Sequence, residues 1–245
     1  MNWIIGDIHG HLQKLKSVLE QIYQQDKSPT IYCVGDCCDR GPDSKGVVDL
    51  ILAEGIHCVR GNHDDIFDCV INGRPTRDGD MQGSDAPLKS LFWFLQFGMD
   101  LTLDSYQISR DVYKKAWRNW DVSEFCKNIP ESHKQFYANL PSFIETDQFF
   151  ITHAYISVHD EILKETAFTG SGRREMLWGR FSKLDIDSLK MWKKTGYFGH
   201  TPVQHYNYES PIEGPNIVLV DMGVHFGNQL AAYCHETKQV IRSRT

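Results

Sequence analysis

The stretch Gly35-Asp36-Cys37-Cys38-Asp39-Arg40-Gly41-Pro42 places two carboxylates and a guanidinium within five residues. It follows the apolar run 30–34, which is rich in β-branched and aromatic residues and predicts a strand. A helix-like pattern comes next, so the stretch is a strand-to-helix loop whose glycines permit sharp bends. Such a loop presents its side chains at the carboxyl end of a strand, where α/β sheets bind their ligands. Taken alone, it is also compatible with an ordinary acidic turn.

Four further loops repeat this arrangement, in which an apolar run is followed by Asp, His or Asn. They are Gly6-Asp7-Ile8-His9-Gly10, Arg60-Gly61-Asn62-His63-Asp64, Thr152-His153-Ala154 and Gly199-His200-Thr201-Pro202. These side chains are hard to borderline metal ligands. The five loops together therefore indicate a metal site built from strand ends.

These motifs, in this order, resemble the calcineurin-like metallophosphoesterases, and within them the phosphoprotein phosphatases with their bacterial and phage members. The resemblance runs from Ile4 to about Phe226, which is nearly the whole chain. It implies a four-layer αββα sandwich of two mixed β-sheets. It also implies a single domain, residues 1–245, with a helical cap insertion at about 72–147.

The resemblance further implies a dinuclear metal site with Asp36 as the bridging ligand. The remaining ligands that it implies are Asp7, His9 and His200 for one ion, and Asn62 and His153 for the other. We expect two divalent ions, Mn²⁺ first, with Fe, Zn, Ni or Mg as alternatives. Such a pair shares a hydroxide that attacks the phosphoryl group directly, without a phosphoenzyme.

Within the same resemblance, His63 matches the general acid that protonates the leaving oxygen, and Asp39 matches the carboxylate that pairs with it. Guanidinium groups suit the oxygens of a transferring phosphoryl group. The arginines at the matching positions are Arg40, Arg60 and Arg180.

Three residues near these motifs leave alternatives open. Arg173 and Arg174 compete with Arg180 for the phosphoryl group, although such a pair is more often solvated. His225 follows a strand end where the family places a loop that lines the cleft.

Hydrophobic periodicity and helix-capping residues predict the helices and strands along the chain. Helical spacing predicts a helix over 11–25, and Asp43 and Gly55 are suited to cap a helix over 44–54. In the insertion, Pro87 opens one helix, a second places Tyr113, Ala116, Trp117 and Trp120 on one face as core residues, and a third covers 132–139. The predicted strands are 2–5, 30–34, 56–59, 148–152, 195–199, 216–221, 229–234 and 238–242, of which the last two form a hairpin.

Composition excludes several classes of function. The 245 residues carry a net charge of −6, which argues against a nucleic-acid backbone binder. We see neither a signal peptide nor an apolar run as long as a membrane span. We therefore expect a cytoplasmic protein, a monomer, without membrane or nucleic-acid partners.

Seven cysteines at scattered spacings suit free thiols in a reducing compartment better than a disulfide framework. Among them, Cys33, Cys37 and Cys38 form a cluster. It is either a metal or redox site, or a set of small apolar fillers around a buried strand end.

The sequence thus favours a metal-dependent phosphoesterase most like a bacterial serine/threonine protein phosphatase. A hydrolase of dinucleoside polyphosphates is the alternative, and a non-catalytic binding module is a third possibility. The substrate is then a phosphorylated protein or a small phosphoester or nucleotide. Asp39 favours phosphomonoesters, because relatives that hydrolyse dinucleoside polyphosphates often lack it. Residues 72–90 carry no net charge, which also disfavours a tetraphosphate.

Overall fold

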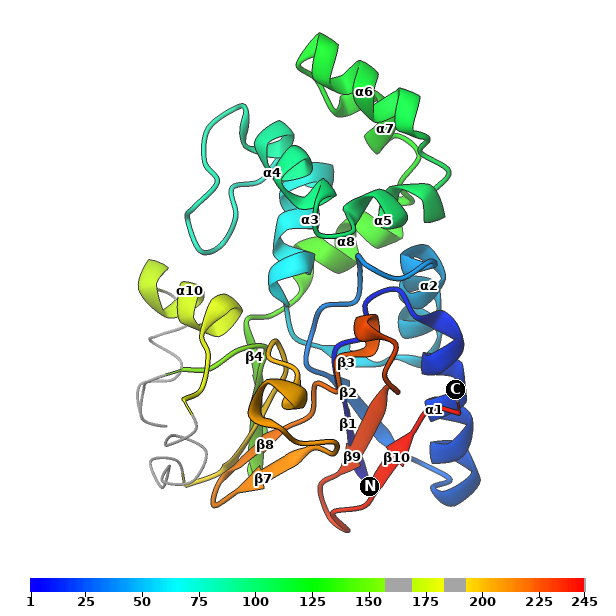
Figure 1. Ribbon diagram of the computed structural model, residues 1–245, viewed down its shortest axis with the longest axis vertical. Coiled ribbons are helices and arrows are strands. Elements are labelled where there is room, and N and C mark those ends of the chain that lie inside the picture. The colour runs from blue at the N-terminus through cyan, green and yellow to red at the C-terminus, as the bar shows by residue number, and fades with distance from the viewer. Residues whose placement is uncertain (157–168, 183–192, 245) are drawn as a thin grey trace.

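Two five-stranded sheets form the lower half of the molecule (Figure 1). The computed structural model describes residues 1–156, 169–182 and 193–244. The first sheet has the order β10 (Val240–Arg242), β9 (Ala231–Cys234), β1 (Asn2–Ile5), β2 (Thr30–Cys33) and β3 (His57–Cys58). The second has the order β4 (Phe143–Glu145), β5 (Phe149–Thr152), β6 (Thr195–Phe198), β8 (Ile217–Leu219) and β7 (Ile212–Gly214).

Both sheets are mixed, as the sequence predicted. β1, β2 and β3 run parallel, whereas β9 runs antiparallel to β1 and forms a hairpin with β10. In the second sheet β5, β6 and β8 run parallel, and β4 and β7 are antiparallel edges. Parallel neighbours end at the same edge, so their carboxyl-terminal loops lie side by side.

Alternation along β1 explains how the layers pack. Ile4 joins a buried cluster with residues of the second sheet such as Ile151 and Val218. Trp3 and Ile5 point the opposite way, into the cluster formed with the helices. Those helices are α1 (Leu12–Gln25) and α2 (Ser44–Glu54). The four-layer sandwich expected from the sequence is therefore confirmed.

The predicted ends of α2 are also confirmed. The Asp43 carboxylate accepts a hydrogen bond of 2.8 Å from the backbone N–H of Gly46. Gly55 ends the helix with φ of 64°, a left-handed conformation that glycine adopts at low cost.

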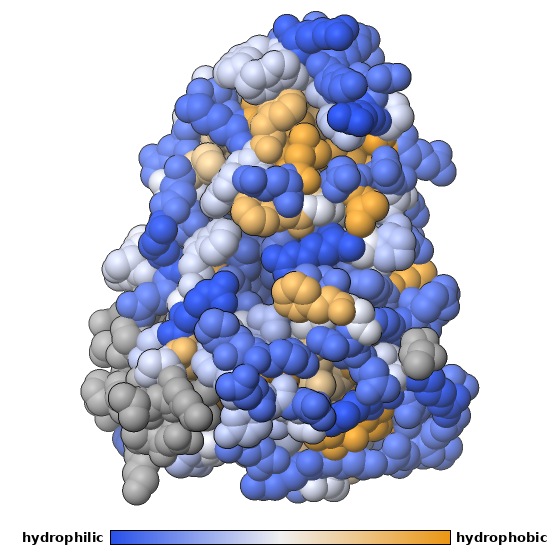
Figure 2. Space-filling model, in the orientation of Figure 1, coloured by the Kyte–Doolittle hydropathy of each residue, from blue (hydrophilic) through white to orange (hydrophobic). Residues whose placement is uncertain are grey.

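A helical region rises above the sheets (Figure 1). Its elements are α3 (Asn62–Asn72), α4 (Ala86–Leu95), α5 (Met99–Ser105), α6 (Arg110–Asn119), α7 (Ser123–Cys126) and α8 (Glu131–Asn139). Buried residues of these helices, such as Phe67, Leu91 and Tyr137, share one apolar cluster with α1 and α2. Hydrophilic side chains cover most of the face in Figure 2, whereas apolar ones gather over the helical region.

One packing prediction for this region is wrong in part. Tyr113 and Ala116 of α6 are buried, but Trp117 and Trp120 are 48% and 54% exposed. Periodicity placed the four on one face. On the outer part of that face the ring of Phe92 contacts that of Trp117, with centroids 4.3 Å apart, and both tryptophans stay about half exposed.

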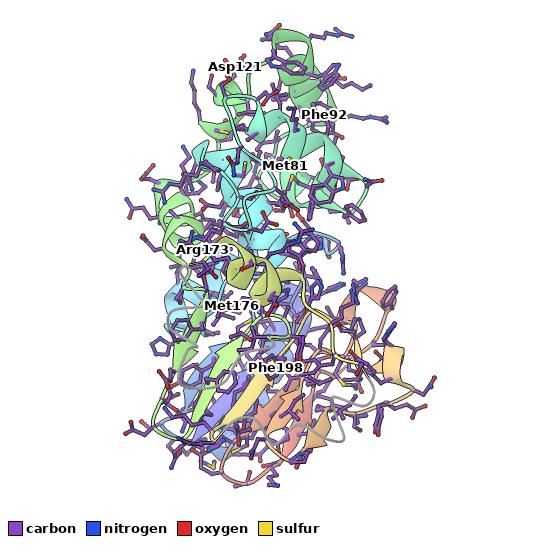
Figure 3. The ribbon with its side chains drawn as sticks, turned by 90° about the vertical axis from the view of Figure 1, so that its left-hand side faces the viewer. Met81, Phe92, Asp121, Arg173, Met176 and Phe198 are labelled. Carbon is purple, nitrogen blue, oxygen red and sulfur yellow. The ribbon has the colours of Figure 1, made fainter. Side chains whose placement is uncertain are left out.

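A further helix, α10 (Gly170–Trp178), lies between the helical region and the second sheet (Figure 3). Its Met176 packs in a buried cluster with Phe198 of β6 and Val203 of η2 (Val203–Tyr206). Among the described residues, no helix is both long and apolar enough to cross a membrane.

Candidate active site

The five motif loops meet at the carboxyl ends of β1, β2, β3, β5 and β6. Five non-glycine residues in these loops adopt left-handed backbone conformations, at φ between 44° and 68°. They are His9, Asp36, Asp39, Arg40 and His200. Such conformations cost free energy and cluster at functional sites, where the surrounding structure holds them in place.

The carboxylate of Asp36 lies at the centre of the site. Its Oδ2 is 3.6 Å from Nε2 of His9 and 3.5 Å from Nε2 of His153. Ligand atoms of Asp7, Asp36 and His153 lie within 4.8 Å of one another, and so do those of His9, Asp36 and His63. Asp36 belongs to both groups, which is the position a bridging ligand needs.

Two glycines make room for these carboxylates. A Cβ at Gly61 would lie 2.1 Å from Oδ1 of Asp36, and one at Gly199 would lie 2.1 Å from Oδ1 of Asp7. Side chains at either position would therefore displace the ligand beside it.

Backbone carbonyls fix the orientation of two histidines. Nδ1 of His9 donates to the carbonyl of Cys38 at 2.9 Å, and Nδ1 of His153 donates to that of Val34 at 2.8 Å. The Nε2 lone pairs consequently face Asp36, as in histidines that bind metals. Burial lowers the pKa of His9 well below its usual range, which keeps the ring neutral and able to coordinate.

Asn62, His153 and His200 form the other side of the site. Oδ1 of Asn62 lies 2.9 Å from Nε2 of His153 and 3.0 Å from Nδ1 of His200. The structure thus corrects the expected grouping, because the ring of His200 contacts Asn62, not His9. Only its backbone N–H reaches Asp7.

The donor set fits divalent cations. Nε2 of His200 is buried and has no hydrogen-bond partner among the residues that the structure describes. Burial, followed by the charges of Asp221 and Asp36, raises the pKa of Asp7 well above its usual range. Cations between these carboxylates would remove that repulsion.

Asp64, which follows the expected acid in the chain, holds two loops together. Its carboxylate accepts backbone hydrogen bonds from Asp36 at 2.8 Å, Cys37 at 2.9 Å and Gly61 at 2.9 Å. It is fully buried and supports the site without facing it. The sequence showed its place in the motif but not this role.

His63 and Asp39 form a buried pair, as expected. Nδ1 of His63 lies 2.7 Å from Oδ2 of Asp39, and the Oγ1 of Thr102 donates to the other oxygen of Asp39 at 2.7 Å. Burial raises the pKa of Asp39 to about 7 and lowers the pKa of His63 to about 3, because it disfavours the charged form of each group. No sequence motif predicted this contact of Thr102, which lies on α5.

Two of the three predicted arginines reach the cleft. Nη2 of Arg40 lies 2.8 Å from Nε2 of His63, and Nη1 lies 3.1 Å from His225. Arg180 lines the same cleft and donates to Oγ1 of Thr201. The competitor Arg174 pairs instead with Asp80.

The structure contradicts a phosphoryl-binding role for Arg60. Its side chain is completely buried, and Nη1 contacts Asp65 at 3.1 Å and Asp68 at 3.0 Å. Its other nitrogens donate to the carbonyls of Leu140 and Tyr137. α3 presents the two aspartates one turn apart on one face, so the guanidinium is bound beneath the loop and does not enter the cleft.

The cleft has a volume of about 530 Å³, and five aromatic side chains are among its lining residues. They are Trp93 and Phe94 of α4, Phe97 just after that helix, Trp178 at the end of α10, and Phe226 of η3 (Val224–Phe226). We call these five residues the aromatic wall. A larger groove of about 700 Å³ at the edge of β3 holds none of the candidate ligands. The cleft is therefore the candidate active site.

A hydrogen bond ties the aromatic wall to the loop between α3 and α4. Nε1 of Trp178 donates to Oδ2 of Asp78 at 2.7 Å, and the ring of Trp178 stacks near that of Trp93 with centroids 6.0 Å apart. This contact was not predictable from the sequence, because the two partners are 100 residues apart.

Curated relatives of the chain include two kinds of phosphoesterase. Serine/threonine-protein phosphatase 1 of Salmonella typhimurium is 24% identical over 93% of this chain and 88% of its own length. The asymmetrical bis(5'-nucleosyl)-tetraphosphatase PrpE of Oceanobacillus iheyensis is 25% identical over 97% of this chain and 90% of its own length. The symmetrical bis(5'-nucleosyl)-tetraphosphatase of Wigglesworthia glossinidia brevipalpis is 43% identical, over 52% of this chain and 49% of its own length.

The fold is also found in solved structures. A putative diadenosine tetraphosphatase superposes with a TM-score of 0.58 at 19% identity, covering 98% of this chain and 91% of its own. Residues 3–218 match the family described as calcineurin-like phosphoesterase. With the ligand geometry above, this match shows that the chain belongs to the calcineurin-like phosphoesterase family and is a metal-dependent phosphoesterase.

Proposed function

We propose that this protein is a serine/threonine protein phosphatase that hydrolyses phosphomonoesters. The observation that carries the proposal is the buried contact of 2.7 Å between His63 and Asp39. The alkoxide of serine or threonine is a poor leaving group, so its departure needs a proton from a positioned acid. A nucleotide leaving from a polyphosphate is a far weaker base and needs this acid much less.

We further propose that the chain holds two divalent ions, with Mn²⁺ as the expected metal. Asp7 and His9 would hold one ion, Asn62, His153 and His200 the other, and Asp36 both. When bound, such ions supply the positive charge that activates water and stabilises the transferring phosphoryl group. The contacts of Asp36 with His9 and His153 support this division.

The chain's own residues complete the reaction. Arg40 and Arg180, which line the cleft, would neutralise phosphoryl oxygens. His63 would donate its proton to the leaving oxygen, and Asp39 would keep the ring oriented through Nδ1. The aromatic wall would exclude water and contact the apolar part of the substrate.

A dinucleoside polyphosphate hydrolase is the second candidate, because PrpE aligns over nearly the whole chain and aromatic rings suit a nucleobase. The charges near the cleft disfavour it. Among the described lining residues only Arg40 and Arg180 are arginine, and none is lysine. Four phosphates call for more donors than these two.

A substrate comparison tests the ranking. With Mn²⁺, kcat/KM should be higher for a phosphoserine peptide than for diadenosine tetraphosphate. The reverse order would favour the dinucleoside polyphosphate hydrolase. If protein with full metal content hydrolysed neither substrate, the result would favour a non-catalytic binding module.

We also propose that the protein acts in the cytoplasm as a monomer, in a single domain whose insertion at about 72–147 supplies helices α4 to α8 as a cap that shapes substrate access. All seven cysteines are unpaired, and the helical region shares its buried cluster with α1 and α2. Gel filtration of the purified chain tests the monomer.

A further inference from the structure

Three cysteines from separate segments converge behind the candidate active site. Cys33 ends β2, Cys37 follows Asp36, and Cys58 ends β3. Their Sγ atoms lie within 4.8 Å of one another, and their side chains are 0%, 0% and 5% exposed. The proposed hydrolysis uses none of these thiols.

Backbone geometry sets this arrangement. Cys33 and Cys58 are register partners on adjacent parallel strands, so their side chains lie on the same face. The turn at Gly35 and Asp36 then brings Cys37 back onto the pair. A zinc–sulfur bond is about 2.3 Å long, so three thiolates around one ion lie about 4 Å apart. The sulfurs lie within 4.8 Å of one another, so small movements of the three cysteines bring them to this spacing.

Three sulfurs select a different kind of ion from the ligands in the cleft. Thiolates prefer soft d¹⁰ cations, whereas carboxylate and amide oxygens suit Mn²⁺ and Mg²⁺. A divalent ion on three thiolates, whose protons pass to solvent, leaves one net negative charge in the interior. A monovalent ion would leave two, at a higher cost of burial. The cluster therefore suits divalent ions of the zinc and cadmium class.

The large groove at the edge of the sheet provides an entry path. Its volume is about 700 Å³, and Cys58 lies in its lining beside Ile56, His57 and Leu140. It shares no lining residue with the active-site cleft. An ion can thus reach Cys58 without passing the catalytic ligands, which meets the access requirement of a metal site.

We propose that Cys33, Cys37 and Cys58 form a buried site for a soft divalent cation, entered from this groove, and that its occupation inhibits hydrolysis. The backbone N–H groups of Cys37 and Asp36 both donate to the carboxylate of Asp64. Because Cys37 directly follows Asp36 and both amides share this carboxylate, any backbone movement that brings Cys37 onto an ion also displaces Asp36.

Cd²⁺ is the probe, because cadmium–thiolate bonds absorb in the ultraviolet. Reduced protein saturated with Mn²⁺ is titrated with Cd²⁺ while absorption and phosphatase activity are recorded together. We expect a charge-transfer band that saturates at one equivalent and an activity loss that excess Mn²⁺ does not reverse. Cys58→Ser should weaken Cd²⁺ binding at least about tenfold.

Cys69→Ser is the matched control, since Cys69 is a buried thiol outside the cluster that contacts Ser90. It should leave the band and the inhibition unchanged. The proposal fails if wild type shows no band, if Cys58→Ser keeps it, or if Cys69→Ser loses it. Inhibition that Mn²⁺ reverses, without a band, would place Cd²⁺ in the catalytic centre instead. Should Cys58→Ser not fold, the wild-type titration and Cys33→Ser carry the same test.

Discussion

The metal-ligand loops and the aromatic wall border the same cleft but are built in different ways. In the loops, backbone groups hold the side chains, as when the Cys38 carbonyl orients His9 and the Asp64 carboxylate fixes the amides of Asp36 and Cys37. In the wall, rings contact rings, and Phe97 and Phe226 are 41% and 71% exposed.

This difference separates the residues that carry out the reaction from the residues that contact the rest of the substrate. A ligand held by buried backbone hydrogen bonds has one position, which metal coordination requires. Exposed rings such as those of Phe97 and Phe226 tolerate substrates of different shape, because their contacts are apolar and less directional. Substitutions of the metal ligands should therefore change kcat and metal content, whereas substitutions around the wall should change KM.

The largest effect is expected for Asp36→Asn, which removes one oxygen of the shared ligand. Loss of one electrostatic contact in a transition state costs about 10²–10³ in kcat, so loss of the bridge should cost at least about 10³. Metal analysis should show that both ions are weakened together. Chelation of wild type should abolish hydrolysis of an aryl phosphate, and Mn²⁺ should restore it. Full activity of the metal-free protein would contradict the assignment of these loops as the source of the metal ligands.

Arg40 and Arg60 give a matched pair of loop arginines with opposite expectations. Arg40→Ala should lower kcat about 10²–10³-fold with little change in stability, because Arg40 lies in the cleft.

Arg60→Ala should instead destabilise the fold by about 3–5 kcal/mol, because Asp65 and Asp68 lose their buried partner. Denaturant unfolding and steady-state kinetics on both variants separate the two roles. If Arg60→Ala lowered kcat while its stability was unchanged, the result would support the original assignment of Arg60 to the phosphoryl group.

Asp78→Asn tests how the wall is positioned, because it weakens the hydrogen bond to Trp178. We expect KM for a phosphopeptide to rise about three- to tenfold, which corresponds to a net hydrogen bond of about 0.5–1.5 kcal/mol. The kcat should stay near wild type. Asp80→Asn is the control, since its ion pair with Arg174 is exposed and contributes little. Equal effects of the two variants would show that the loop as a whole matters, not the Trp178 contact.

The smallest effect is expected for Arg74→Ala and Arg77→Ala. The guanidinium of Arg77 donates to the carbonyl of Ala138, away from the lining of the cleft. KM for a phosphomonoester should change modestly, and kcat should be nearly intact. A selective hundredfold drop on diadenosine tetraphosphate in the double variant would favour the second candidate function.

The sequence predicted the loops far better than the wall. Asp7, Asp36 and Asn62 follow apolar runs within fixed motifs, so their side chains had to meet where neighbouring strands end. The buried position of Arg60 could not be predicted, because it depends on Asp65 and Asp68 one turn apart and on the carbonyl of Tyr137 in α8. The grouping of His200 with Asn62 likewise depends on how two sheets pack.

Prediction from the sequence also failed for short or partly exposed elements. β4 and β7 were missed because they are short edge strands with partly exposed residues, so neither forms a continuous buried apolar run as β8 does. Periodicity placed Trp117 on one face of α6 but could not show that little packs against it. Trp178 and Asp78 became partners only through the tertiary fold.

The most direct test of the account is the dependence of His63→Asn on the leaving group. We predict that kcat on an alkyl phosphate falls by about 10²–10⁴, while the loss on an aryl phosphate with a good leaving group is much smaller. Metal content should match wild type, and Asp39→Asn should show the same pattern more mildly. An equal loss on both substrates, at full metal content, would contradict the assignment of His63 as the acid.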